Sequence, residues 1–176
     1  MNISNFDKSI DTWISSLENY SYQELSAKPG PQSWSMLQVI IHLIRENKFY
    51  EKQIEECLYN NENIGEEMKE EAKAMFENNE FPDQRLKGSD LPENMPVPAN
   101  KAALEQQLLE LKNEMDLLWI KINNNASSGK TSHPGLGYFN AKEWFRFAEM
   151  HLRHHLRQKA RIDEFLRANL QKDQLI

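Results

Sequence analysis

The chain has 176 residues, a formal net charge of −6, five histidines and a single cysteine, Cys57. Its length suits one domain over residues 1–176, and its 39% hydrophobic and 27% charged residues are typical of a globular protein. The acidic balance argues against a nucleic-acid partner, and no apolar run approaches the roughly 20 residues of a membrane span. The first residues do not resemble a signal peptide, and a lone cysteine cannot form an internal disulfide. We therefore expect a cytoplasmic protein that binds neither nucleic acid nor membrane.

Apolar residues recur with the spacing of an amphipathic helix in several segments of the chain. These segments are residues 4–25, 35–57, 101–124 and 140–170. Ser35 with Gln38, and Asn140 with Glu143, have the spacing of a capping box before the second and fourth segments, and Asn100 is a candidate cap for the third. The pattern predicts an all-α fold, a four-helix bundle.

The region between the second and third predicted helices is long and polar. Residues 66–78 predict a short exposed helix, and residues 81–98 contain four prolines. We therefore expect a long surface crossover between helices 2 and 3. A second turn-rich stretch, HPGLGYF at residues 133–139, precedes the fourth helix.

The histidines predict a metal site. His151 and His155 have i,i+4 spacing on the apolar face of the fourth helix, whereas His154 lies among arginines and should face water. His42 lies in the most apolar part of the second helix, where an unpaired imidazole would cost roughly 1–3 kcal/mol. A hydrogen-bonded structural histidine is the alternative for His42. Three inward histidines favour a divalent ion, Zn²⁺, Ni²⁺ or Fe²⁺, with an open coordination position. No Glu-x-x-His pair is present, which argues against a di-iron site, and Glu149 should point elsewhere.

Two segments together resemble the DinB/YfiT-like superfamily of small four-helix metalloproteins. They are QSWSMLQVIIHLI (residues 32–44) and HPGLGYFNAKEWFRFAEMHLRHHLRQ (residues 133–158). The resemblance implies His42, His151 and His155 as the metal ligands. Members with an assigned reaction mostly use the metal to activate a low-molecular-weight thiol, such as bacillithiol or mycothiol, in transfer or isomerisation. This implies a transferase with a thiol co-substrate and a small-molecule substrate. A metal-dependent hydrolase, a non-catalytic metal- or ligand-binding (stress-related) bundle, and homodimerisation stay open.

For the other polar residues near the histidines, the sequence predicts roles less specifically. We expect Glu46, one turn after His42, to be solvated, with a role as a base or as a hydrogen-bond acceptor in the site as the alternative. Gln158 is as well placed to bond within the site as outside it, and His133 belongs to a structural turn rather than to a substrate contact. Cys57 should be an inert buried thiol. The basic residues of the fourth helix should form a solvated face that neighbouring acids balance: Arg153, Arg157, Lys159 and Arg161.

Overall fold

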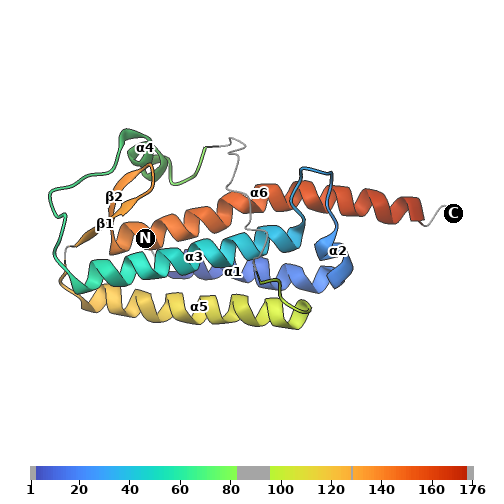
Figure 1. Cartoon of the computed structure of the whole chain (residues 1–176), viewed down its shortest axis with the longest axis horizontal. Coiled ribbons are helices and arrows are strands. Elements are labelled where there is room, and N and C mark those ends of the chain that lie inside the picture. The colour runs from blue at the N-terminus through green and yellow to red at the C-terminus, as the bar shows by residue number, and fades with distance from the viewer. Residues whose placement is uncertain (1–2, 83–95, 128, 174–176) are drawn as a thin grey trace.

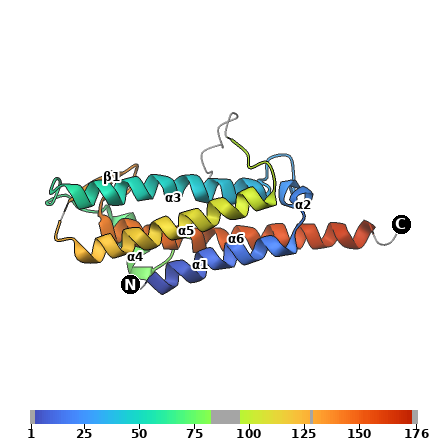
Figure 2. The same ribbon diagram turned by 90° about the horizontal axis from the view of Figure 1, so that it is seen from below.

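The computed structural model describes residues 3–82, 96–127 and 129–173. Within these residues the protein is mostly helical, with one small two-stranded sheet. Helices α1, α3, α5 and α6 lie side by side along the long axis, and α4 lies with the β1–β2 hairpin at one end (Figures 1 and 2). The elements are α1 (Ile3–Ser16), the 3₁₀ turn η1 (Leu17–Asn19), α2 (Tyr22–Ser26), α3 (Met36–Tyr59), α4 (Glu70–Asn78), α5 (Lys101–Asn124), β1 (Lys130–His133), β2 (Gly137–Asn140) and α6 (Ala141–Asp173).

The long helices begin where the sequence predicts. The Ser35 hydroxyl accepts a hydrogen bond from the backbone N–H of Gln38, whose side chain accepts one from the N–H of Ser35. Asn140 and Glu143 form the same reciprocal pair before α6, and the Asn100 side chain caps α5. These bonds satisfy backbone donors that a helix start leaves without partners. The starts of α3 and α6 position the histidines, because both helices carry them.

The prediction of one continuous first helix over residues 4–25 is wrong. α1 ends at Ser16, whose hydroxyl donates to the carbonyl of Trp13, and α2 starts only after Ser21. Ser21 and Glu24 form a complete capping box. A serine that caps a new helix offers the backbone an alternative to continuing the old one, which explains the interruption.

The sequence did not predict the β-hairpin that precedes α6. Its turn lies within the turn-rich stretch 133–139, and His133 is paired with Gly137 across the strands. Gly137 has a φ of 87°, and a Cβ there would lie 2.5 Å from the Glu67 carbonyl oxygen. Glycine therefore permits both the left-handed backbone and the close approach of the preceding segment. The short helix predicted over 66–78 begins at Glu70, after this contact.

Two tryptophans connect the elements of the core. The indole N–H of Trp13 donates to the carbonyl of Leu152 and thereby joins α1 to α6. The indole N–H of Trp144 donates to Thr131 and joins α6 to the hairpin. Cys57 is buried against Thr131, as expected for an inert thiol.

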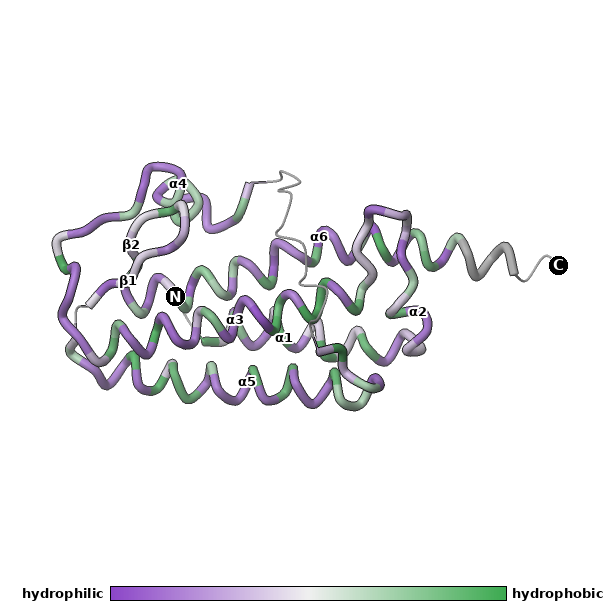
Figure 3. The backbone as a smooth tube through the Cα atoms, in the orientation of Figure 1, coloured by the Kyte–Doolittle hydropathy of each residue, from purple (hydrophilic) through white to green (hydrophobic). Residues whose placement is uncertain are grey.

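Hydrophobic and hydrophilic residues alternate in bands along α3 and α5 (Figure 3), as expected for helices with one buried face. Among the described helices, none combines the length and the apolar character that a membrane crossing requires. Residues 83–95 of the predicted crossover lie outside the described residues.

Candidate metal centre

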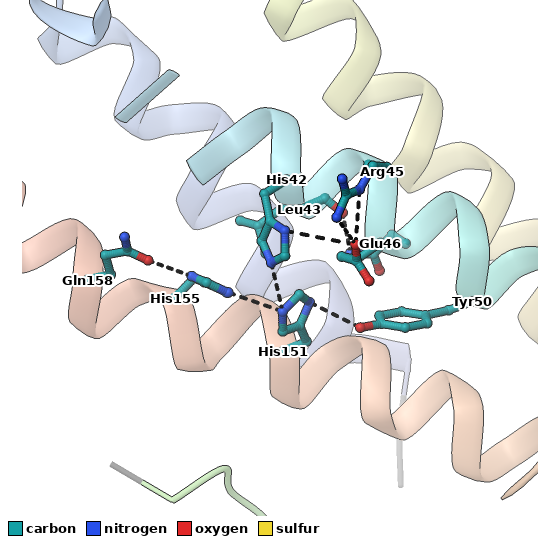
Figure 4. A network of polar contacts seen from close by, with 9 residues as sticks. His42, Leu43, Arg45, Glu46, Tyr50, His151, His155 and Gln158 are labelled. Atoms are coloured by element: carbon teal, nitrogen blue, oxygen red, sulfur yellow. Dashed lines mark hydrogen bonds and ion pairs between the residues drawn. The ribbon is translucent and has the colours of Figure 1, made fainter. Parts of the chain in front are cut away.

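The packing of α3 against α6 brings three histidine rings together. His42 projects from α3 toward His151 and His155 of α6 (Figure 4). The Nε2 atom of His151 lies 3.3 Å from Nε2 of His42 and 3.1 Å from Nε2 of His155. His42 and His151 are buried, and His155 is partly buried. The predicted convergence of these three residues is confirmed, and their ligand atoms all lie within 4.8 Å of one another.

The other ring nitrogen of each histidine, Nδ1, faces a different side chain. Nδ1 of His155 lies 2.8 Å from Oε1 of Gln158. Nδ1 of His151 lies 3.5 Å from the Tyr50 hydroxyl, and Nδ1 of His42 lies 3.9 Å from a carboxylate oxygen of Glu46. A Gln Oε1 only accepts hydrogen bonds, so its contact assigns the proton of His155 to Nδ1. Gln158, whose role the sequence left open, thus bonds within the site.

This arrangement fits a cation at the point where the Nε2 atoms converge. A neutral imidazole with its proton on Nδ1 presents a lone pair at Nε2. When the protons lie on Nδ1, the Nε2 lone pairs face one another at 3.1 and 3.3 Å, an arrangement that a cation between them stabilises. Nitrogen ligands at 2.0–2.1 Å from a tetrahedral ion are roughly 3.3 Å apart, close to the separations seen here. The three residues therefore have suitable spacing and donor chemistry for a divalent metal.

Burial keeps these imidazoles neutral. Desolvation, assisted by the neighbouring His155, lowers the pKa of His42 to about 3. Desolvation also lowers the pKa of His151 well below its usual value and lowers that of His155, where the bond to Gln158 opposes the shift. Metal ions bind the neutral form of histidine, so the rings are in the ligating state at neutral pH.

Glu46 is not the solvated residue that we expected. Its side chain is 25% exposed, and one oxygen approaches Nδ1 of His42. The same oxygen accepts hydrogen bonds of 2.6 and 3.0 Å from the guanidinium of Arg45. The carboxylate lies beside Nδ1 of His42 (Figure 4), but at 3.9 Å it accepts no hydrogen bond from this nitrogen, so the alternative role as an acceptor or a base stays a prediction.

His133 and Glu149 lie outside the histidine cluster. His133 is partly buried in an aromatic cluster with Phe139 and Trp144, in agreement with a structural role in its turn. Glu149 is buried and accepts hydrogen bonds from Ser9 and from an arginine of its own helix. It therefore points elsewhere, as predicted.

The polar face of α6 is less exposed than the sequence predicts. His154 is only partly exposed, because the Phe81 ring lies 5.4 Å away, centroid to centroid, and Arg157 donates to its Nδ1. Neighbouring acids balance the basic residues as predicted, since Arg153 pairs with Glu149 and Lys159 pairs with an aspartate of its own helix. The face is less solvated than predicted, because Arg157 donates to the carbonyl of Phe81. Tertiary contacts thus cover much of this face.

Two aromatic residues lie next to the site: Trp34, which the sequence predicts to be a packing residue at the start of the second helix, and Phe81, which sequence reasoning missed. The ring of Trp34 lies 5.1 Å from that of His42, and the ring of Phe81 lies 5.8 Å from that of His151. Trp34 directly precedes the cap of α3, a position that often carries a packing residue. Phe81 was a single apolar residue in a polar connection, which is a weak signal.

The fold and the three histidines define the class of the protein: a mostly helical protein with a candidate three-histidine metal centre between two long helices. The family model described as the DinB superfamily matches residues 5–158, and the chain belongs to this superfamily. Searches of curated proteins and of solved structures gave no significant match.

Proposed function

We propose that this chain is a metal-dependent enzyme built on a four-helix bundle of α1, α3, α5 and α6. His42, His151 and His155 hold one divalent ion, and the reaction transfers or isomerises a group with the help of a low-molecular-weight thiol. The observation that carries the proposal is the convergence of three Nε2 atoms with separations of 3.1 and 3.3 Å. Membership of the DinB superfamily supports it.

Two side chains next to the histidine ligands, Gln158 and Glu46, orient them. Gln158 accepts a hydrogen bond from Nδ1–H of His155 and thereby keeps Nε2 available as the ligand atom. Glu46 places a negative charge near Nδ1 of His42 and favours the same tautomer there. Burial lowers the pKa values of His42 and His151, so protons do not compete with the metal for the ring nitrogens at neutral pH.

The metal accounts for the proposed chemistry. A bound divalent cation lowers the pKa of a thiol or of a water molecule at the same site, which supplies a nucleophile at neutral pH. Three protein ligands leave a position for that group, as in catalytic zinc sites. A hydrolase would use water at the same position, and a non-catalytic bundle would use neither.

The first experiment is the metal content of protein purified without a histidine tag. We expect about one equivalent of Zn²⁺, Ni²⁺ or Fe²⁺ in the wild type, as for a mononuclear site. His42→Ala and His151→Ala should lose this ion. His154→Ala is the matched control, since its residue lies on α6 outside the group of converging nitrogens, and it should retain the ion.

Activity assays separate the remaining possibilities. Thiol-dependent turnover by the metal-loaded wild type, absent in His42→Ala, supports the transferase. Turnover without added thiol indicates a hydrolase. A stoichiometric metal without turnover in either assay indicates the non-catalytic bundle, and a wild type that never binds metal contradicts the proposal altogether.

A further inference from the structure

Phe81 covers the face of α6 next to the candidate ligands. Its side chain is 6% exposed, and its ring centroid lies 4.8 Å from that of Phe147, 5.8 Å from that of His151 and 5.4 Å from that of His154. The three residues that Phe81 contacts are spaced at i, i+4 and i+7, so they lie along one face of α6. The segment that carries Phe81 follows α4, far from α6 in the sequence.

A row of arginines on α6 holds this segment in place. α4 ends at Asn78, and the next residue, Asn79, caps it in the left-handed conformation with a φ of 54°. The last carbonyls of a helix lack partners within it, and cations are favourable there. The guanidinium-to-carbonyl pairs are Arg146 to Phe76, Arg153 to Asn79 at 2.7 Å and Arg157 to Phe81 at 2.8 Å. The last pair holds Phe81 by its own backbone.

His151 depends on packing more than its neighbour does. His155 has a hydrogen bond of 2.8 Å to Gln158, whereas the contact of His151 with the Tyr50 hydroxyl is 3.5 Å, the long limit for such a bond. The His151 ring lies between two aromatic rings, with Tyr50 and Phe81 each at 5.8 Å from it. Removal of either ring would leave space in which the imidazole can rotate.

We propose that Phe81 is a positioning residue of the metal centre. Held by Arg157, it packs on His151, keeps Nε2 directed at the metal and excludes water from that side. The part of this proposal that concerns the metal rests on the proposed function. It concerns a residue that the histidine motif does not contain and that reaches α6 only through the fold.

The test compares Phe81→Ala with Phe76→Ala. Phe76 is a matched control because it is 8% exposed, lies in α4 directly before the segment that carries Phe81 and packs against Phe139 of the hairpin. Both variants should lower the thermal midpoint. Only Phe81→Ala should also accelerate zinc removal by excess chelator, by about tenfold or more, the range over which groups around metal ligands act. Phe81→Leu, which refills most of the space, should restore slow release.

A second pair of variants tests the role of the arginine. Arg157→Met keeps the aliphatic stem but removes the donor to the Phe81 carbonyl and to Nδ1 of His154, and His154→Ala, which loses only the second bond, is its control. Arg157→Met should accelerate zinc release in the same direction as Phe81→Ala, and the double variant should release zinc no faster than Phe81→Ala alone. Equal acceleration by Phe76→Ala and Phe81→Ala, or release at the wild-type rate from Phe81→Ala, would overturn the proposal.

Nuclear magnetic resonance of the metal-free protein separates this proposal from the proposed function. Phe81→Leu removes the same aromatic ring current but refills most of the space, so it is the reference. Relative to Phe81→Leu, Phe81→Ala should shift the ring signals of His151 more than those of His155, because of the two histidines only His151 packs against Phe81. If the wild type binds no zinc while these shifts occur, the metal site fails and the positioning of His151 holds. Identical His151 signals in Phe81→Ala and Phe81→Leu would overturn the positioning role whether or not zinc binds.

Discussion

Nε2 of His42 lies 3.3 Å from Nε2 of His151, although 109 positions separate the two residues in the chain. Each residue belongs to a helix with its own capping box, and the two helices pack directly against each other. The contact is therefore a product of helix packing rather than of a local motif. A site divided in this way depends on the side chains that orient each ring, and these can be tested separately.

Gln158→Leu should weaken zinc binding roughly 10–100-fold, the usual effect of losing a hydrogen-bond partner of a metal-bound histidine. Leucine cannot accept a hydrogen bond from Nδ1–H of His155, so the ring loses both its tautomer preference and its orientation. Competition titration with a chromophoric chelator measures the affinity. Gln158→Glu keeps an acceptor at this position and should bind zinc at least as well as the leucine variant. Wild-type affinity in Gln158→Leu would contradict the assigned role.

Tyr50→Phe should weaken zinc binding less than Gln158→Leu does. The hydroxyl of Tyr50 lies 3.5 Å from Nδ1 of His151, whereas the Gln158 contact is 2.8 Å. Phenylalanine also keeps the ring that stacks on Trp144 at 5.6 Å. The same titration ranks the two variants. A larger loss in Tyr50→Phe would mean that the hydroxyl, rather than packing, orients His151.

The free energy of unfolding of the metal-free protein should fall as the pH drops from about 6.5 toward 5. Burial holds the pKa of His42 at about 3 and lowers those of His151 and His155, whereas unfolding restores the ordinary value near 6.5. Below that pH the unfolded chain binds protons that the folded protein does not. Each histidine then contributes a slope of up to about 1.4 kcal/mol per pH unit.

Urea denaturation at several pH values in this window measures the slope. His42→Gln removes one of the titrating groups and should give a shallower dependence than the wild type. Identical slopes for the two proteins would show that His42 takes up no additional proton on unfolding.

Cys57 should not react with Ellman's reagent in the native protein and should react fully in denaturant. Its side chain is 1% exposed, and burial raises the pKa of the thiol, so little of the reactive thiolate forms. Cys57→Ala should keep the metal content of the wild type. Rapid reaction of the native protein, or loss of metal in the variant, would show that the thiol is accessible to the site.

The main helices and the histidine pair of α6 follow from local patterns. Helical periodicity and the capping pairs Ser35–Gln38 and Asn140–Glu143 predict α3 and α6 with nearly correct starts. The spacing of His151 and His155 predicts that they share a face. These features depend on residues within a few positions of one another, which is why one sequence suffices to find them.

Other features depend on partners distant in the sequence. The hairpin before α6 pairs short strands whose residues also fit a turn, and Glu46 could be assigned to the site only once its distance from His42 was known. Arg157 looks like a surface cation until the Phe81 carbonyl is placed beside it. Periodicity specifies which face of a helix is buried. Packing between elements determines which neighbour buries that face. The same packing determines which side chains surround the three histidines.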